Sequence, residues 1–340
     1  MKAVILAGGL GTRLRPVTGE HPKPMVPVLG RPMMEHIVEL LRENGYTQIC
    51  AALHYRAGEI MAHFGDGRKF GVELEYRIET ENLGTAGSVK NCRDFYGDED
   101  FLVISADAAC DYDLRLLMHA HQEHGASATL ALSAEQIPLR YGLAVMDGEG
   151  YIRSFIEKPD WPQVVTDLVN TGIYVLSPGA MERVPEGPFD FGRDLFPKLL
   201  REGAPLYGQV MAGYWRDIGT PQDYYRSCAD ALDGRLRLTP GTAFQQAEHP
   251  APAADTGEEG CTLDCDCVDR ARLMGTLSEL MLDMGATFDD GIRLAGNGFA
   301  LHISPSAVRS AVRIAVRSED AELARALCLS VKDVAEKLNM

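Results

Sequence analysis

The chain has 340 residues, of which 46% are hydrophobic, and it carries a formal net charge of −16. The length suggests about two domains, and the composition is sufficient for full hydrophobic cores. An acidic chain lacks the basic surface that nucleic-acid binding requires, so we expect no nucleic-acid partner. No apolar run approaches the ~20 residues of a membrane span, and the N-terminal residues do not resemble a secretory signal. We therefore expect a cytoplasmic protein without membrane contact.

Strand and helix patterns alternate along the first two thirds of the chain. Short apolar runs predict strands at residues 3–7, 47–53, 72–76, 101–105 and 127–133. Helical spacing at residues 33–45 predicts one of the intervening helices, and such alternation indicates a mainly parallel α/β sheet. Later strands, predicted at 142–147, 151–157 and 171–177, come closer together and indicate added hairpins. The predicted sheet is therefore mixed, and a helix at 221–233 closes this part of the chain.

A change of composition separates a second, smaller part. Residues 237–262 are rich in proline, alanine, glycine and acidic residues, which predicts a linker between a domain at 1–236 and a domain at 263–340. Strands at 291–295, 298–304 and 311–317 and helices at 269–285 and 318–338 predict a small α+β fold for the second domain. Ser318 is in position to cap the last helix.

A glycine-rich turn follows the first strand and contains Gly8, Gly9 and Gly11, then Thr12 and Arg13. Glycine lets a ligand approach bare backbone N–H groups, and successive N–H groups form an anion-binding nest. Because ligands bind at strand ends in open α/β sheets, we interpret this as a phosphate-binding turn to which Arg13 adds positive charge. The spacing fits neither the dinucleotide fingerprint nor the Walker loop. The alternative is an ordinary tight turn with a surface arginine.

Lys23 lies between Pro22 and Pro24, which restrict the backbone on both sides. We interpret it as a positioned lysine, the alternative being a solvated surface residue. Together, L-A-G-G-L-G-T-R-L-R-P at 6–16 and K-P-M at 23–25 resemble the signature of the sugar-1-phosphate nucleotidyltransferases. The resemblance extends to about residue 233, and it implies a Rossmann-like nucleotidyltransferase domain with Arg13 and Lys23 as catalytic residues. The nucleotide contacts that it implies in this region are Leu6, Ala7, Gly8, Gly9, Gly11 and Thr12.

Two further motifs extend the resemblance. L-G-T-A-G at 83–87 is similar to the family's base-binding turn, which implies nucleotide contacts by Gly84, Thr85 and Gly87; otherwise it is an ordinary turn before a helix. Asp107 follows the buried strand at 101–105, where the family usually has Gly-Asp and this chain has Ala-Asp. Asp217 lies in W-R-D-I-G-T-P at 215–221, where a turn-forming aspartate is the alternative. The resemblance implies that Asp107 and Asp217 bind Mg²⁺.

Three other segments are similar to the family's sugar-binding segments, namely R-Y-G-L-A-V-M-D at 140–147, F-I-E-K-P-D at 155–160 and V-N-T-G at 169–172. The positions to which the resemblance assigns the sugar phosphate are Gly142, Glu157, Lys158, Asn170 and Gly172. A glutamate accepts hydrogen bonds from sugar hydroxyls, and a lysine holds a phosphate.

The resemblance implies a reaction in which an NTP and a sugar-1-phosphate give an NDP-sugar and pyrophosphate. Mg²⁺ is the implied cofactor, and we expect a homo-oligomer. GTP and mannose-1-phosphate are the first choice, because L-G-T-A-G and the C-terminal segment resemble the mannose-1-phosphate guanylyltransferase branch most. The alternatives are a glucose-1-phosphate uridylyl-, thymidylyl- or adenylyltransferase, and a catalytically silent sensor of nucleotide-sugars.

The segment at 289–322 resembles the C-terminal domain of phosphohexomutases. Of that family's phosphate loop, R-P-S-G-T-E-P, the chain keeps Pro305 and Ser306, so we expect a remnant or scaffold rather than mutase activity. Cys261, Cys265 and Cys267 lack the paired C-x-x-C spacing of zinc sites. The scattered cysteines are expected to be reduced, as is usual in a cytoplasmic protein.

Overall fold

The structure is a computed structural model that describes residues 1–135 and 137–241, the strands at 259–266, 292–296, 299–305 and 311–318, and isolated helical residues between and after these strands. Its contacts divide the chain into two compact units. The first combines Met1–Leu10 with Met34–Arg216, and the second combines Gly11–Met33 with Asp217–Met340. The predicted domain boundaries, at residues 236 and 263, stay predictions.

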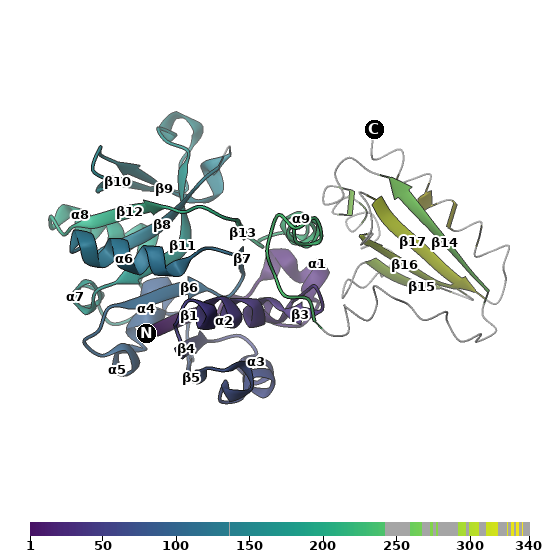
Figure 1. The fold of residues 1–340 in the computed structure, drawn as a ribbon, viewed down its shortest axis with the longest axis horizontal. Helices are drawn as coiled ribbons and strands as arrows, with labels where there is room; N and C mark the ends of the chain where they lie inside the picture. Colours follow the sequence, from purple (N-terminus) through teal and green to yellow (C-terminus); the bar gives the residue numbers. More distant parts are fainter. Residues whose placement is uncertain are drawn as a thin grey trace. The chain divides into compact units, whose positions relative to one another are not determined.

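A nine-stranded mixed sheet forms the centre of the first unit (Figure 1). Its strands are β1 (Lys2–Ala7), β4 (Gln48–Leu53), β5 (Glu73–Ile78), β6 (Phe101–Ser105), β8 (Ala128–Ala134), β9 (Gly142–Met146), β10 (Ile152–Glu157), β11 (Leu168–Leu176) and β12 (Leu206–Val210). Their order is β10-β9-β11-β6-β1-β4-β5, and β8 pairs with both β11 and β12. The neighbouring strands β5, β4, β1 and β6 are parallel to one another, and β8 is parallel to β12. Strand β11 pairs antiparallel with β6, β8 and β9. The mixed α/β fold predicted from the sequence is confirmed.

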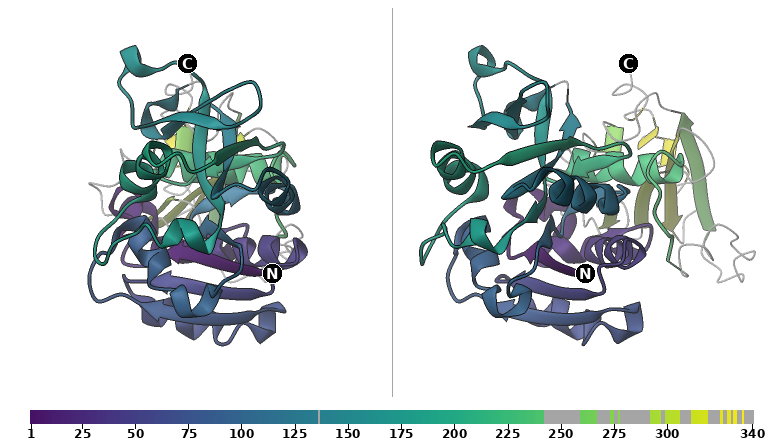
Figure 2. Two further views of the ribbon diagram at one scale, coloured as in Figure 1. Left: turned by 90° about the vertical axis from the view of Figure 1, so that its left-hand side faces the viewer. Right: turned by 60° about the vertical axis from the view of Figure 1, so that its left-hand side comes forward.

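Helices cover the sheet of the first unit. They are α2 (Met33–Glu43), α3 (Ala57–Phe64), α4 (Gly84–Lys90), α5 (Arg93–Tyr96), α6 (Leu114–His124), α7 (Pro178–Met181) and α8 (Phe196–Arg201). Val4 and Val103 on the sheet pack in one core with Val89 of α4 and Phe196 of α8. The neighbouring residue Ile5, which faces the other side of the sheet, is also fully buried. Burial on both faces explains why these strands read as unbroken apolar runs, and Figure 2 shows β1, in purple, beside the blue strands β4 and β5.

Local signals fix the ends of several elements. α2 is followed by Gly45, whose φ of +83° suits glycine at the end of a helix. The Asp113 carboxylate caps α6 by accepting a hydrogen bond from Arg115 N at 3.1 Å. The side chain of Asn44, just after α2, accepts a hydrogen bond from Leu114 N at 2.9 Å and joins the end of α2 to the start of α6.

A small two-stranded sheet lies beyond the end of β6. It pairs β7 (Ala108–Cys110) with β13 (Trp215–Asp217). Beside it, Asp111 N donates to Tyr214 O at 3.1 Å, and Tyr214 N donates to the Asp111 carboxylate at 2.7 Å. The chain just after Asp107 is therefore paired with the chain just before the W-R-D motif.

The second unit joins the segment at 11–33 to the chain that follows Arg216. Its elements include α1 (Arg15–Thr18), the short strands β2 (Pro27–Val28) and β3 (Arg31–Pro32), and α9 (Pro221–Leu232). The hydroxyl of Tyr224 in α9 donates to Pro27 O at 2.8 Å, and Gly241 N donates to Leu29 O at 2.9 Å. Helix α9 begins with proline in its first turn, as the sequence predicts.

The C-terminal residues that the structure describes form a four-stranded antiparallel sheet in the order β14-β17-β16-β15. Strands β15 (Ile292–Gly296), β16 (Phe299–Pro305) and β17 (Ala311–Ser318) confirm the three predicted strands. β14 (Glu259–Asp266) is a correction, because it begins inside the stretch predicted as a linker. The composition of residues 237–258 indicates a linker, and this prediction was extended too far, into the start of β14. Cys265 of β14 is buried.

The helices, the linker and the phosphate loop predicted for this region fall on residues that the structure describes only in part. Ser318 is the last residue of β17 and is not helical, while residues 319–324, where the predicted final helix would begin, lie outside the described residues. Residues 325, 328, 329, 331, 332 and 335 are helical, as are 273, 274 and 277 within the predicted helix at 269–285. Residues 242–258 of the predicted linker and 306–310 of the predicted phosphate loop lie outside the described residues. Across the described part of the chain, every helix is too short or too polar to cross a membrane.

Candidate active site

The glycine-rich turn leaves the sheet where β1 ends, at the edge where β6 also ends. β1 and β6 are parallel neighbours, and Ala106 N donates a hydrogen bond to Leu6 O at 2.9 Å. Ala7 is buried and anchors the start of the turn. Asp107, with a half-buried side chain, follows at the same edge. The first unit therefore brings the start of the predicted phosphate turn close to one of the two predicted metal ligands.

The glycines of this turn differ in how closely the protein surrounds them. A Cβ at Gly8 would lie 3.3 Å from the Cβ of His54, and a Cβ at Gly9 would have no described atom within 4 Å. The backbone N–H groups of Gly9, Leu10 and Gly11 have no hydrogen-bond partner among the described residues. Successive unpaired N–H groups beside open space suit an anionic ligand.

Lys23 is fixed in the second unit by Gly11 and Asp217. Gly11 has a φ of +58°, and a Cβ there would lie 2.9 Å from the Cβ of Lys23. The Lys23 ammonium is 3.4 Å from the Asp217 carboxylate, and the lysine side chain is only 11% exposed. Lys23 and Asp217, predicted from motifs 194 positions apart, are thus brought together. The lysine is held in place rather than solvated.

Arg13 and Thr12 belong to a short 3₁₀ helix, Thr12–Leu14, and both are exposed. Leu14 is fully buried and anchors this turn, while its N–H donates to Gly11 O at 2.9 Å. Within the described part of the chain, Arg13 has no ion-pair partner. Its guanidinium is therefore available to an anionic ligand, although the ordinary surface arginine of the sequence analysis has the same appearance.

The predicted base-binding turn uses its glycines differently. Gly84 has a φ of +68°, and a Cβ there would lie 2.7 Å from Phe189 O. A Cβ at Gly87 would lie 2.8 Å from Gly187 O. Phe189 O also accepts hydrogen bonds from Ala86 N at 2.9 Å and from Gly87 N at 3.0 Å. Both glycines thus permit close approach of the protein's own backbone, and contact with a nucleobase stays a prediction.

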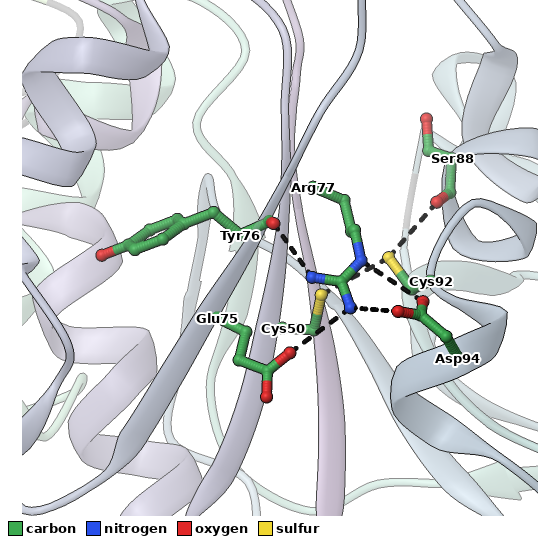
Figure 3. Close-up of polar contacts among 7 residues, drawn as sticks. All are labelled: Cys50, Glu75, Tyr76, Arg77, Ser88, Cys92 and Asp94. Atoms are coloured by element: carbon green, nitrogen blue, oxygen red, sulfur yellow. Dashed lines mark hydrogen bonds and ion pairs between the residues drawn. The ribbon is translucent and has the colours of Figure 1, made fainter.

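Residues 84–87 form the first turn of helix α4 rather than a turn before a helix, which corrects that alternative reading. Helix α4 is tied to the sheet by side chains of β4 and β5 (Figure 3). The Cys92 thiol donates to Ser88 O, and it lies 3.6 Å from the Cys50 thiol. Arg77 of β5 forms an ion pair with Asp94 of α5 at 2.6 Å, and this contact lowers the pKa of Asp94. These contacts hold α4 and α5, and with them the turn at 83–87, against the sheet.

Glu157 ends β10 opposite Gly142 of β9. A Cβ at Gly142 would lie 2.8 Å from Glu157 Oε2, so glycine makes room for the carboxylate. Burial raises the pKa of Glu157, while the positive charges of Lys158 and Arg193 oppose the shift. The carboxylate makes no hydrogen bond within the described residues. A desolvated acceptor of this kind suits a ligand that carries hydroxyl groups.

The other predicted sugar-side residues surround the same region of the sheet. Lys158 is exposed and has a φ of +47°, which is unusual for a residue with a side chain. A break in the β11–β8 register lies between Asn170 and Tyr174. There the Asn170 side chain accepts a hydrogen bond from Gly172 N at 3.0 Å and donates one to the Tyr174 hydroxyl at 2.9 Å. Gly172, with a φ of +78°, permits this bulge.

Residues 189–192, F-D-F-G, match none of the motifs predicted to form the site, although they contact the segment at 83–87 and Glu157. The local signal was an acidic residue and a glycine among aromatic residues, which does not reveal partners about 105 and 35 positions away in sequence. Asp107 belongs to the first unit and Asp217 to the second, so the predicted pair of metal ligands stays a prediction.

The cysteines agree with the expected reduced state. Cys50, Cys92, Cys110, Cys228 and Cys328 form no disulfide bond. Cys265 forms none either and is buried in β14, whereas the side chains of Cys261 and Cys267 lie outside the described residues. Among the side chains that are described, no group of three or more His, Cys, Asp or Glu is arranged to hold a metal ion.

Known proteins resemble this chain over most of its length. The profile of the nucleotidyl transferase family matches residues 2–234. A UTP–glucose-1-phosphate uridylyltransferase of Synechocystis is 39% identical over 251 residues, which cover 70% of this chain and 65% of that protein. A mannose-1-phosphate guanylyltransferase of Mycobacterium tuberculosis is 33% identical over 299 residues, which cover 86% of this chain and 80% of that protein.

A solved structure shows the same fold. The crystal structure of HddC from Yersinia pseudotuberculosis in complex with GMP-PN matches with a TM-score of 0.59 and 32% identity, covering 67% of this chain and 98% of HddC. The family profile covers residues 2–234, the range that contains the motifs at 6–16, 23–25, 83–87 and 215–221. The chain therefore belongs to the nucleotidyl transferase family, as a sugar-1-phosphate nucleotidyltransferase.

Proposed function

We propose that the chain transfers a nucleoside monophosphate from an NTP to a sugar-1-phosphate, with GTP and mannose-1-phosphate as substrates and GDP-mannose and pyrophosphate as products. The observation that carries the proposal is the position of Lys23, which packs on Gly11 with its ammonium 3.4 Å from Asp217. A held cation and a carboxylate beside Gly11, whose backbone N–H has no described partner, suit a triphosphate better than a neutral ligand.

In the proposed reaction, a phosphate oxygen of the sugar-1-phosphate attacks the α-phosphorus of the NTP. A new P–O bond forms while the bond between the α-phosphorus and the oxygen bridging to the β-phosphorus breaks, and that electron pair leaves with pyrophosphate. The attacking oxygen is already anionic near neutral pH, so no general base is required. The obstacle is repulsion between two anions, which positioning and positive charge overcome.

We assign this charge to two residues. Arg13 would contact the β- and γ-phosphates and stabilise the leaving pyrophosphate, since a guanidinium matches phosphate oxygens with two donors. Lys23 would contact the α-phosphate, where charge builds up in the transition state. Backbone donors of the turn, with Leu6, Ala7, Gly8, Gly9, Gly11 and Thr12, would hold the rest of the nucleotide, and Gly84, Thr85 and Gly87 would lie at its base.

Asp107 and Asp217 fit a magnesium ion in their chemistry. Both side chains are partly exposed carboxylates, and Mg²⁺ is typically bound through one or two carboxylates together with substrate phosphates. Nucleotidyltransferases of this family generally use a divalent metal. When bound, Mg²⁺ would neutralise charge on the phosphates and align the attack. The two aspartates would bind the Mg²⁺ ion through their carboxylate oxygens.

On the sugar side, Glu157 would accept hydrogen bonds from hydroxyl groups and Lys158 would contact the sugar phosphate. Gly142, Asn170 and Gly172 would complete this side of the site. The raised pKa of Glu157 favours a ligand that supplies hydrogen-bond donors, because these replace the water that burial removes.

A glucose-1-phosphate uridylyltransferase is the second candidate, because the Synechocystis relative with that name is 39% identical. A pyrophosphate-release screen of GTP, UTP, dTTP and ATP, each with mannose-1-phosphate and glucose-1-phosphate, separates the candidates. We expect the largest kcat/KM for GTP with mannose-1-phosphate. A preference for UTP with glucose-1-phosphate would favour the second candidate, and tight NDP-sugar binding without turnover on any pair would indicate a silent sensor.

A further inference from the structure

The segment at residues 189–192 lies between the turn at 83–87 and Glu157. Towards the turn, the Asp190 carboxylate accepts hydrogen bonds from the backbone N–H and the hydroxyl of Thr85, both at 3.2 Å. The Thr85 hydroxyl in turn accepts a hydrogen bond from Phe191 N at 3.0 Å. Thr85 is therefore oriented by Asp190 and by the backbone next to it, and the first turn of α4 is fixed with it.

On the side of Glu157, the important residue of the same segment is Gly192, which has no side chain. A Cβ at Gly192 would overlap Glu157 Oε2 and would lie 3.2 Å from the Phe155 ring. Gly142 lies against the same oxygen from β9. The Glu157 carboxylate makes no hydrogen bond within the described residues. Its position is therefore set by the space that Gly142 and Gly192 leave for it.

The segment between these two contacts is held by its own hydrogen bonds and by packing. Asp190 N donates to the Asp194 carboxylate at 2.8 Å, and a single π-helical turn, Phe191–Leu195, follows. Phe191 is buried, with its ring 4.9 Å from that of Tyr174. A short π-helical turn is uncommon and is often found at functional sites. These contacts hold both ends of the segment in place.

We infer that residues 189–192 are a positioning element that fixes the nucleotide-side turn and the sugar-side carboxylate relative to one another. Asp190 acts on the nucleotide side through Thr85, and Gly192 acts on the sugar side through Glu157. The names of the two substrates rest on the proposed function, but the positioning of Thr85 and Glu157 does not. Neither Asp190 nor Gly192 is a catalytic residue, because each acts through another side chain.

The sugar arm of the test is Gly192→Ala. The added methyl group displaces the Glu157 carboxylate, so the KM for the sugar-1-phosphate rises by about tenfold, while the KM for the NTP and the melting temperature stay near wild type. Adding Glu157→Asp shortens the displaced side chain, and the double variant recovers part of the loss. Gly58→Ala is the matched control, because a Cβ at Gly58 meets nothing within 4 Å.

The nucleotide arm is Asp190→Ala, which removes two hydrogen bonds to Thr85 and raises the KM for the NTP by about tenfold. The KM for the sugar-1-phosphate changes little. Asp190→Asn, which keeps an acceptor oxygen, restores most of the affinity. Equal changes of both KM values in both variants, or lower melting temperatures without any KM change, would overturn the inference.

Crystal structures of Gly192→Ala and wild type separate this inference from the proposed function. The inference expects a displaced Glu157 carboxylate over an unchanged β9–β10 backbone, whatever reaction the wild-type chain performs. An unmoved carboxylate overturns the inference even if the wild type proves to be an active transferase. If Gly192→Ala fails to fold, the double variant with Glu157→Asp is expected to fold, and its failure to do so counts equally against the inference.

Discussion

The two glycine-rich turns of this chain use the same residue type for opposite purposes. Around Gly9 a side chain would enter open space, and the backbone donors at residues 9–11 have no described partner. Around Gly84 a side chain would collide with Phe189 O, and the backbone donors of residues 85–87 are bonded to residues 189 and 190. The first turn leaves its donors open and so suits a ligand, whereas the second packs against another part of the chain.

This difference shows what a glycine motif reveals about function. Both turns were predicted to bring backbone close to a nucleotide. In the second turn the backbone that comes close is the protein's own, so any nucleobase contact there would use atoms other than the crowded faces of Gly84 and Gly87. The first turn keeps its donors for a ligand, which makes it the better candidate for the charged part of the substrate.

The largest effect is expected at the two carboxylates that are predicted to bind the metal ion. Asp107→Asn and Asp217→Asn should each lower kcat by about a thousandfold, because each removes a charge from the proposed metal site. The double variant should lose little more, since groups that serve one ion are not additive. Pyrophosphate release measures all three variants, with Asp98→Asn, a surface carboxylate paired with Arg93, as the control. Losses that multiply in full would exclude a shared metal site.

A smaller effect is expected for Arg13→Ala. Removing a group that stabilises developing charge on pyrophosphate should lower kcat by about a hundredfold, while NDP-sugar binding by calorimetry changes little. The matched control is Arg15→Ala, because Arg15 is also exposed and lies two positions further along. Equal losses in the two variants would mean that general positive charge, rather than the position of Arg13, matters.

Gly84→Ala and Gly9→Ala compare the two turns directly. Gly84→Ala combines an unfavourable φ with a backbone clash and should reduce the free energy of unfolding by about 2 kcal/mol or more. Gly9→Ala should change it by less than about 0.5 kcal/mol, yet should weaken NTP binding. Urea unfolding and calorimetry provide the two measurements. A stability loss for Gly9→Ala that matches the loss for Gly84→Ala would remove the distinction between the turns.

The sequence predicted the parts of this site that depend on local pattern. The apolar run before Gly8, the proline-flanked Lys23 and the proline at the start of α9 all have local physical causes, and the structure has the corresponding elements. The central sheet was predictable for the same reason, because strands buried on both faces are continuous apolar runs.

Contacts between distant segments could not be predicted in this way. The clash that makes glycine necessary at Gly84 involves Phe189, and the space that Glu157 occupies depends on Gly192. Neither partner carries a sequence signal that points to the other. β14 was missed because its strand pattern lies next to a stretch whose composition indicates a linker. Composition is averaged over a window, whereas strand pairing depends on a few alternating residues.

The smallest effect is expected on removal of the C-terminal part. Every residue assigned to chemistry precedes residue 225, and the family profile ends at residue 234. A chain of residues 1–236 should therefore keep kcat within about threefold of the full chain, although its oligomeric state can change. Pyrophosphate release at matched concentrations of folded protein tests this. A folded fragment with activity reduced by about a hundredfold would show that the C-terminal part completes the active site.

The most direct test of the central claim follows the reaction of GTP, mannose-1-phosphate and Mg²⁺ with the full chain by phosphorus NMR. We predict that signals of GDP-mannose and pyrophosphate grow in equal amounts as both substrates disappear, and that Arg13→Ala slows both signals together. Release of inorganic phosphate without an NDP-sugar, or an unchanged spectrum with this and every other pair of NTP and sugar-1-phosphate, would contradict the proposed transfer.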